Sequence, residues 1–199
     1  MNLVLSDFDG TITTHDSLRD FLLYAVGYKK FLIKMFPVIP WLIGYILRIA
    51  DNQKVKKIVT KQFFTNFDLD EFNKKAENFA LKILDRSVRP HIIEALRKHK
   101  LNGDRVIVVS ASFTDYLKYW CNREGFELIS TKLEVKDNKI TGEFATPNCW
   151  GAEKIRRLSE LLPLNNLHDK YEKIFVYADS PNGGDKEMLG LGDEKIIVK

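Results

Sequence analysis

The sequence is poor in cysteine and histidine, and neither residue type occurs at a spacing typical of metal ligands. Its two cysteines, Cys121 and Cys149, are too few for a disulfide framework, so we expect buried or incidental thiols, which are compatible with a reducing compartment. The chain also has no internal repeat and no low-complexity tract. With 45% hydrophobic and 29% charged residues among 199, the composition excludes a disordered or fibrous protein. The length is typical of one catalytic core with a modest insertion.

A cleavable leader is not visible at the N-terminus. The first hydrophobic stretch, residues 3–5, leads directly into the acidic Asp7 and Asp9. Cleavage there would remove the strand that carries both acidic residues. We therefore expect a cytoplasmic protein.

The longest hydrophobic segment is interrupted. Residues 31–50 include fifteen apolar residues, but the longest uncharged stretch within them, residues 35–47, has only thirteen residues and contains Pro37 and Pro40. A spanning helix needs about 20 apolar residues, whereas a run of about 10–14 is typical of a core helix or of a helix at the membrane interface. We expect a buried helix here, and the flanking basic residues keep peripheral membrane attachment as the alternative.

Positive charge is concentrated in one part of the chain. Residues 28–61 contain eight Lys or Arg and one acidic residue, which gives this segment a net charge of +7 and leaves −3 for the rest. A basic balance confined to one segment predicts a local anionic partner and argues against a nucleic-acid surface along the whole chain. An anionic membrane is one candidate for this partner, because Trp41 and Tyr45 in this segment are residue types typical of a membrane interface.

Short apolar runs alternate with helical stretches along the chain. Strands are predicted at residues 3–6, 106–109, 174–177 and 196–198, and helices at about 114–124 and 152–162. This alternation predicts an α/β fold with a parallel sheet covered on both faces. Ligands bind such sheets beyond the carboxyl ends of the strands. Asp7, Ser110 and Asp179 each follow a predicted strand, so we expect them to converge there.

A long insertion separates the first two of these strands. Residues 13–87 are expected to be helical throughout, which divides the chain into a core of residues 1–12 and 88–199 and a helical cap of residues 13–87.

Polar residues and turns give the expected boundaries of further elements. Asp16 or Ser17 is expected to cap a helix that runs to about residue 26, and Asp68 or Asp70 to cap a later one with an apolar face. Pro90 permits a further helix toward the second strand, and a small hairpin is expected within residues 132–144.

Two carboxylates follow the first strand, in the motif Asp7-Phe8-Asp9-Gly10-Thr11. Alternation along a strand places Asp7 and Asp9 on the same side, and a divalent cation can relieve the repulsion between them. The alternative interpretation is a pair of solvated loop acids before a turn at Gly10.

Four motifs taken together resemble those of haloacid dehalogenase-type phosphatases. They are Asp7-Phe8-Asp9-Gly10-Thr11, Val108-Val109-Ser110-Ala111-Ser112-Phe113, a segment around Lys154, and Tyr177-Ala178-Asp179-Ser180 with Asp185-Lys186-Glu187-Met188-Leu189. They occur in the order usual for that family, and with the insertion the resemblance covers nearly the whole chain. The helical insertion and residues 141–154 resemble the phosphoserine phosphatase-like branch, subfamily IB. The resemblance implies a Rossmann-like core with an inserted α-helical cap.

This resemblance also implies Mg²⁺-dependent hydrolysis of a phosphomonoester. Asp7 would attack phosphorus and form an aspartyl-phosphate, and Asp9 would protonate the leaving oxygen and then activate water. Mg²⁺ would be held by Asp7, the backbone carbonyl of Asp9, and Asp179.

The remaining residues carried over from the resemblance bind phosphate or support the site. Phosphate would be bound by Ser110, Lys154, Thr11 and Ala111. Asp185, together with Ser180, would support the site, with Asp185 orienting the metal ligands or Lys154.

Three departures from the family pattern bear on these roles. Ala178 stands where the family usually has glycine, and the five residues between Asp179 and Asp185 exceed the usual spacing, which leaves the role of Asp185 open. Asp16 stands near the start of the cap, where relatives that recognise amino acids have glutamate. Asp16 is therefore a candidate specificity residue, and its shorter side chain disfavours phosphoserine.

The substrate remains open between a phosphorylated small molecule and a lipid head group. The lipid alternative rests on the apolar and basic segment of residues 28–61. The resemblance supports it, because bacterial phosphatidylglycerophosphatases occur in this branch, and the enzyme would then be peripheral to the inner face of the membrane. A phosphotransferase that passes phosphate to an alcohol is a further alternative. A catalytically silent binding protein on the same fold is another, although the presence of both Asp7 and Asp9 argues against it.

Overall fold

The computed structural model describes residues 1–47 and 49–199. Within these residues the core is a parallel sheet with the strand order β4–β3–β1–β7–β8. Its strands are β1 (Leu3–Ser6), β3 (Arg105–Phe113), β4 (Glu127–Thr131), β7 (Ile174–Ala178) and β8 (Glu194–Ile197). The α/β class and the parallel sheet predicted from the sequence are confirmed.

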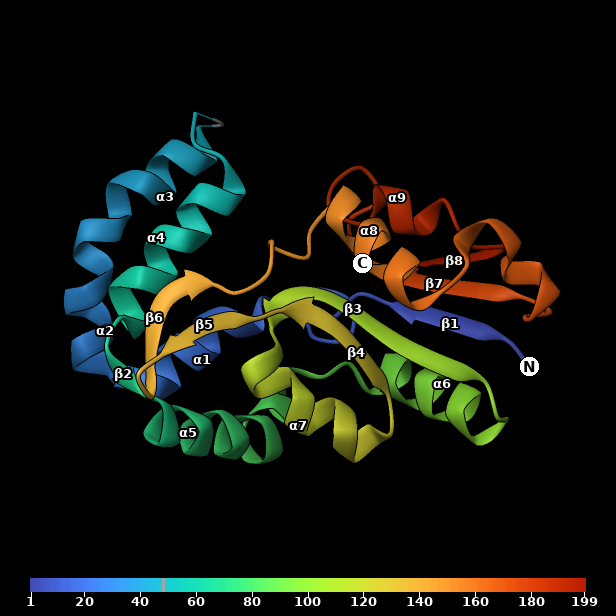
Figure 1. Cartoon of the computed structure of the whole chain (residues 1–199), viewed down its shortest axis with the longest axis horizontal. Helices are drawn as coiled ribbons and strands as arrows, with labels where there is room; N and C mark the ends of the chain where they lie inside the picture. Colours follow the sequence, from blue (N-terminus) through green and yellow to red (C-terminus); the bar gives the residue numbers. More distant parts are fainter. Residues whose placement is uncertain (48) are drawn as a thin grey trace.

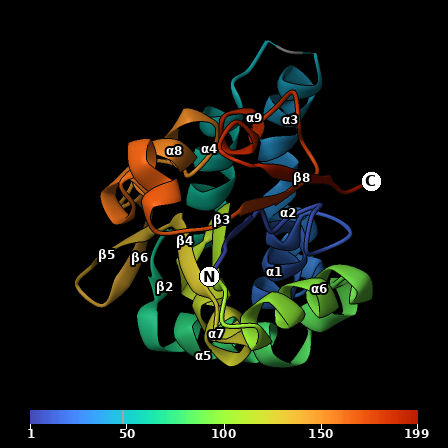
Figure 2. The same ribbon diagram turned by 90° about the vertical axis from the view of Figure 1, so that its right-hand side faces the viewer.

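Helices cover both faces of this sheet. Figures 1 and 2 show α6 (Pro90–Leu101) and α7 (Thr114–Glu124) on one side, and α8 (Ala152–Leu161) and α9 (Lys186–Leu189) on the other. Alternate strand residues supply the two cores: Val4 packs toward the α6 and α7 side, while Leu3 and Leu5 pack toward α8. The 3₁₀ helix η3 (Leu164–Asp169) follows α8.

The second strand of the chain's core, β3, is longer than predicted. It continues through Ser110 to Phe113, so the prediction that the strand ends before Ser110 is wrong. Pairing with β4 holds it in place: Ser110 lies opposite Ser130, and after an irregularity Phe113 lies opposite Thr131.

The region between β1 and α6 is mostly helical. It contains α1 (Ser17–Val26), α2 (Tyr28–Met35), η1 (Phe36–Val38), α3 (Ile39–Ile46), α4 (Asn52–Phe64), β2 (Phe67–Asp68), α5 (Leu69–Lys82) and η2 (Leu84–Ser87). Of the alternatives offered by the sequence, Asp16 caps α1 through Leu18 N–H at 2.8 Å. Asp68 caps α5 through the N–H groups of Asp70 and Glu71.

A short strand breaks the expected all-helical pattern of residues 13–87. Asn66, with φ of 62°, turns the chain so that β2 pairs antiparallel with β6 (Lys139–Phe144), which pairs in turn with β5 (Leu133–Lys136). The predicted hairpin is confirmed, and its two-residue turn has positive φ at Asp137 and Asn138.

The expectation of a buried helix in residues 31–50 is wrong. Over residues 28–47, Val38 is the only buried residue, whereas Ile33, Phe36 and Ile46 are 73–77% exposed. Helix α2 packs against α1 and α4, and α3 packs against α4; in Figure 1 α2 and α3 lie at the outer edge of the molecule. The described helices include none with the length and apolarity needed to cross a membrane.

Candidate active site

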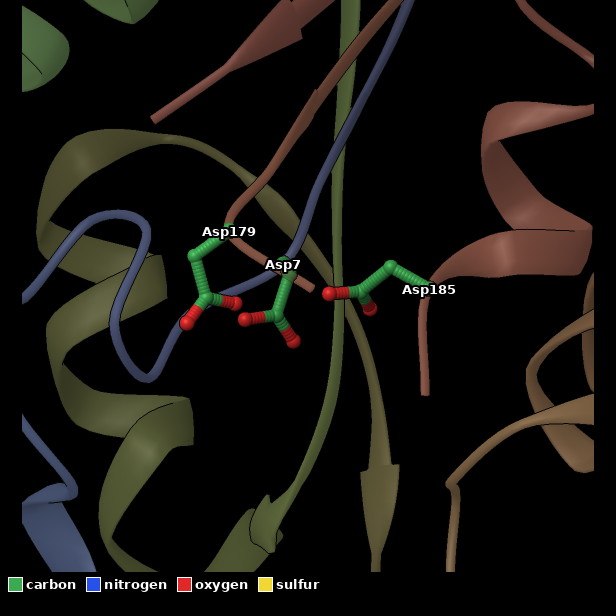
Figure 3. A group of neighbouring side chains, drawn as sticks. All are labelled: Asp7, Asp179 and Asp185. Carbon is green, nitrogen blue, oxygen red and sulfur yellow. The ribbon is translucent and has the colours of Figure 1, made fainter. Parts of the chain in front are cut away.

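An acidic cluster lies at the carboxyl ends of the central strands. Asp7 follows β1, Asp179 follows β7, and Asp185 immediately precedes α9 (Figure 3). Among the described residues, these three offer carboxylate oxygens within 4.8 Å of one another. The expected convergence of Asp7 and Asp179 therefore occurs, and the long loop between Asp179 and Asp185 still returns Asp185 to the cluster.

One buried lysine partners two of these carboxylates. Lys154 Nζ lies 2.5 Å from Asp7 Oδ1 and 2.6 Å from Asp185 Oδ1, and its side chain is almost fully buried. Burial alone would lower the pKa of Lys154, but Asp7 and Asp185 hold that pKa above its ordinary value. Lys154 lies near the start of α8, where the positive φ of Gly151 leads the chain into the helix.

The cluster has more negative than positive charge. Burial raises the pKa of Asp7 to about 7, against the opposing effect of Lys154 and with a further contribution from Asp185. Burial also raises the pKa of Asp179. Three carboxylates share one lysine, which leaves net negative charge at the cluster, and closely spaced oxygen ligands are the donors that Mg²⁺ prefers. The residues present therefore fit a magnesium ion.

Local backbone geometry brings the first motif against Asp179. Gly10 has φ of 80°, and a Cβ at this position would lie 2.2 Å from Asp179 Oδ2. Thr11 then directs its hydroxyl back to Asp7 Oδ2, to which it donates at 3.2 Å. A side chain at position 10 would thus displace a member of the acidic cluster.

Asp9 is held apart from the cluster by the cap and by β3. Its Oδ1 accepts from Ser17 N–H at 2.7 Å, and its Oδ2 accepts from the Ser112 hydroxyl at 2.5 Å. The carboxyl group is therefore fixed beside the pocket and apart from the three clustered carboxylates, in a position from which a carboxyl group can donate or accept a proton. Sequence reasoning missed Ser112, although it lies in the second motif.

The predicted phosphate-binding residues of β3 occupy different depths. Ser110 is fully buried, and its hydroxyl oxygen accepts from Ser112 N–H at 3.0 Å, which leaves its proton free to be donated. Ala111 lines the pocket directly, as does Ser180 beside Asp179.

A pocket of about 440 Å³ extends from the acidic cluster into the cap. Its core end is polar and includes the three clustered carboxylates, Asp9 and Lys154. Its other end, which we call the apolar arm, is lined by apolar and aromatic side chains of four cap helices: Leu18, Leu22, Phe31, Met35, Leu42, Tyr45, Val55 and Val59.

Two charged residues from the helical region between β1 and α6, Lys56 and Asp16, also line the pocket. Lys56 of α4 donates to Ala111 O and to Asn148 Oδ1, the latter at 2.8 Å, and burial lowers the pKa of this lysine to about 8. Asp16 is accessible to solvent inside the pocket, yet the enclosing protein, with a contribution from Asp9, raises its pKa to about 6. Sequence reasoning counted Lys56 only as one of several basic residues, because its core contacts are distant in sequence.

Comparisons with known proteins agree with this architecture. Residues 4–189 match the family described as haloacid dehalogenase-like hydrolase. Protein CicA of Caulobacter vibrioides is 29% identical over 195 residues, which are 97% of this chain and 84% of that protein.

Two solved structures share the fold at low sequence identity. A protein of unknown function from Bordetella pertussis Tohama I has a TM-score of 0.76 at 18% identity, with 98% of this chain and 89% of that chain covered. A phosphoserine phosphatase, solved as an analogue of its phospho-aspartyl intermediate, has a TM-score of 0.67 at 18% identity, with 98% and 85% covered.

Proposed function

The chain belongs to the haloacid dehalogenase-like hydrolases, and from this premise we propose that it is a phosphatase that hydrolyses a phosphomonoester through an aspartyl-phosphate on Asp7. The observation that carries the proposal is the meeting of Asp7, Asp179, Asp185 and Lys154 at one edge of the sheet, with Asp9 fixed beside them. The phospho-aspartyl analogue described for the phosphoserine phosphatase of similar fold supports the same route.

The proposed reaction has two displacements on phosphorus. A carboxylate oxygen of Asp7 attacks, the bond from phosphorus to the ester oxygen breaks, and protonated Asp9 gives its proton to the departing alcohol. Asp9 then takes a proton from water as that water attacks the aspartyl-phosphate. The acyl phosphate bond breaks, inorganic phosphate leaves, and both carboxyl groups return to their starting states.

Asp7 is proposed to bind Mg²⁺ together with Asp179 and the backbone carbonyl of Asp9. A magnesium ion bound by these residues would offset the repulsion between the carboxylates and the anionic phosphoryl group. Lys154 supplies a second, fixed positive charge beside Asp7, and Asp185 holds that lysine in position.

The remaining predicted residues are proposed to hold the phosphoryl group and to shape the pocket. Thr11 would orient Asp7, and Ala111 and Ser180 line the pocket, where Ala111 would bind a phosphoryl oxygen and Ser180 would support the loop after Asp179. Ser110 is fully buried and is not part of the pocket lining, and its hydroxyl is proposed to donate to a phosphoryl oxygen from beneath the pocket surface. Asp16 caps α1 and lines the pocket, which supports a contact with the non-phosphate part of the substrate.

We also propose the division into a core of residues 1–12 and 88–199 and a cap of residues 13–87. The pocket lies where the two meet. A cytoplasmic location is part of the proposal and accords with the two free, buried cysteines.

A screen of sugar, amino-acid, nucleotide and lipid phosphates, with and without Mg²⁺, tests the proposal. Release of inorganic phosphate that requires Mg²⁺ and Asp7 supports hydrolysis. Transfer of phosphate to an added alcohol in place of water would identify a phosphotransferase. Tight binding of phosphate esters without turnover would identify a silent binding protein.

A second candidate function is catalysis at the surface of an anionic membrane. We define the docking face as the exposed apolar residues of α2, η1 and α3, together with Leu47 and Ile49: Leu32, Ile33, Phe36, Ile39, Ile43, Ile46, Leu47 and Ile49. An exposed apolar patch of this kind marks an interaction site. Lipid is favoured as its partner by the exposed lysines nearby, since basic residues near an anionic surface contribute about 1 kcal/mol each.

Not every basic residue of the segment is available for lipid. Lys34 donates to the carbonyls of Gln62 and Phe63 at the end of α4, and Lys56 is inside the pocket. Arg48 lies outside the described residues. Lys57 lies over the Phe144 ring of β6, and Lys61 pairs with Glu143. Lys29 and Lys30 are exposed on α2, and the exposed Lys54 lies with its Nζ 4.8 Å from the centre of the Trp41 ring on α3.

Co-sedimentation with anionic and neutral vesicles, at low and high salt, tests this candidate. Binding that requires anionic lipid and weakens with salt supports it. Sedimentation analysis without lipid checks for a second copy of the chain on the docking face. A stable dimer that does not bind vesicles would contradict membrane attachment.

A further inference from the structure

The pocket is larger and more apolar than a phosphoryl group requires. Its volume of about 440 Å³ falls within the range of pockets that enclose whole small molecules. Leu18 and Leu22 of α1, like Val55 and Val59 of α4, are four residues apart, so each helix presents a continuous apolar stripe to the pocket. Phosphate fits the polar end alone, and the apolar arm must therefore serve another part of the substrate.

Resting on the proposed phosphatase activity, we infer that the substrate is an amphiphilic phosphomonoester whose hydrocarbon chain lies in the apolar arm while its phosphoryl group reaches Asp7. The two kinds of pocket lining match the two parts of such a molecule. The acidic cluster and Lys154 would face the phosphoryl group, Lys56, which is hydrogen-bonded to Ala111 and Asn148 of the core, and Asp16 would adjoin the polar atoms next to it, and the apolar arm would take the hydrocarbon. Hydrolysis consumes one water and releases the long-chain alcohol and phosphate.

The same helices form both the apolar arm and the docking face. On α2, Phe31 and Met35 line the pocket, while Leu32 and Ile33 are exposed. On α3, Tyr45 lines the pocket and is also 45% exposed, and its hydroxyl accepts from Asn52 Nδ2 at 3.2 Å. Tyr45 thus lies at the point where the arm meets the outer surface, and α2 and α3 stand at the outer edge of the cap in Figure 1. The hydrocarbon chain of a lipid that leaves a bilayer at the docking face would enter the apolar arm beside Tyr45.

Alkyl phosphates of increasing length, from ethyl to octyl and below their micelle concentrations, test the inference. Each methylene that enters the arm is expected to raise kcat/KM roughly fourfold until the arm is full. Hydrolysis of ethyl phosphate with no gain from longer chains would overturn the inference and leave the phosphatase standing. If no ester is hydrolysed, the phosphatase proposal fails. Calorimetric binding of octyl phosphate against ethyl phosphate then decides the inference, since equal affinities would overturn it.

Variants that fill the apolar arm test whether the hydrocarbon chain of the substrate lies there. Leu42→Trp and Val59→Trp should lower the octyl-to-ethyl ratio of kcat/KM at least tenfold, because they take up space within the arm. Met35→Gln keeps a similar side-chain length and should also lower the ratio, so it serves if the larger residues disturb folding. Gln62→Trp, which is exposed on α4 outside the pocket, is the matched control. An unchanged ratio in folded arm variants contradicts the inference.

A further experiment decides whether the substrate is a membrane lipid or a soluble amphiphile. One long-chain phosphate ester is supplied to the enzyme either as a monomer in solution or within anionic vesicles. Faster turnover in vesicles identifies a membrane lipid as the source, and faster turnover of the monomer identifies a soluble amphiphile. Either result retains recognition of the hydrocarbon. Failure to bind or turn over the long-chain ester in both forms would overturn it.

Discussion

Two regions of the molecule differ in which side chains they bury. Charged groups are buried at the carboxyl ends of the core strands, whereas apolar groups are exposed on the outer helices of the cap. In the core, Asp7, Lys154 and Asp185 are buried and partnered with one another. In the cap, Ile33 and Phe36 expose most of their side chains. Buried charges persist only when they are partnered, and exposed apolar patches are typical of surfaces that another body covers. The core therefore fixes the chemistry, and we infer that the cap determines which molecules reach it.

In the core, replacement of the proposed nucleophile should have the largest effect on turnover. Asp7→Asn should lower kcat by three orders of magnitude or more, on the order of other nucleophile losses, because the amide cannot form the covalent intermediate. The fold should persist, since Lys154 retains Asp185. Phosphate release and circular dichroism measure the two effects, with the exposed Asp169→Asn as control. Turnover near wild type would refute the mechanism.

Metal removal acts on the same buried charges. A chelator should abolish activity, and added Mg²⁺ should restore it, because the acidic cluster has too little positive charge of its own. Asp179→Asn should raise the Mg²⁺ concentration for half-maximal activity roughly tenfold or more, as expected for a weakened metal site. A titration of activity against Mg²⁺ measures this shift. Full activity in metal-free buffer would rule out the proposed site.

Gly10 tests how closely the core packs its catalytic groups. Gly10→Ala places a Cβ 2.2 Å from Asp179 Oδ2 and should reduce kcat/KM by on the order of 100-fold, since small displacements at a catalytic site have effects of that size. Gly103→Ala is the matched control, because φ there is 82° and nothing lies within 4 Å of the added Cβ. Both variants should lose about 1–2 kcal/mol of stability from the left-handed backbone. Equal activity in the two would mean that Asp179 tolerates the displacement.

The cap side of the comparison is tested at the docking face. Ile33→Glu with Phe36→Glu should weaken binding to anionic vesicles at least tenfold, since full burial of one such side chain contributes about 1.5–3 kcal/mol. Leu101→Glu changes an equally exposed apolar residue of α6 in the core and should leave vesicle binding intact. Co-sedimentation measures both, and similar losses in both variants would remove the docking face from the proposal.

The two regions also differ in how far the sequence predicts them. Asp7 and Asp179 could be placed together because each follows a buried strand, and parallel strands end at one edge of the sheet. Strand β4 was not predicted from the sequence, because it lies at the edge of the sheet and begins with the exposed Glu127 and the partly exposed Leu128, which do not form an apolar run. The contacts of Ser112 and Lys56 depend on how the cap meets the core, which no local pattern encodes. For α2 and α3, the apolar composition predicts helices without showing what covers them.

A buried carboxylate at the opposite end of the sheet allows a charge that stabilises the fold to be compared with the charges of the proposed active site. Asp104 precedes β3 and accepts from His99 Nδ1–H at 2.8 Å and from the backbone and side-chain amides of Asn2 at 2.8 and 3.2 Å. Burial would raise the pKa of Asp104, but these hydrogen bonds hold it below its ordinary value. A lowered pKa in the folded state means that the ionised group stabilises the fold above its unfolded pKa of about 3.9, and that this stabilisation is lost as pH falls through the folded pKa.

Asp104→Asn should therefore lower the free energy of unfolding at pH 7 by about 1.5–3 kcal/mol, the range for hydrogen bonds to a charged group. The difference from wild type should shrink as pH falls below about 4, because Asp104 is protonated first in the unfolded state and, at lower pH, in the folded state as well. Urea unfolding between pH 3 and 7 measures this dependence, and kcat at pH 7 should change little because Asp104 lies at the amino end of β3. A stability loss that does not vary with pH would show that shape, not charge, is what Asp104 contributes. A large fall in kcat would contradict the separation between the two ends of the sheet.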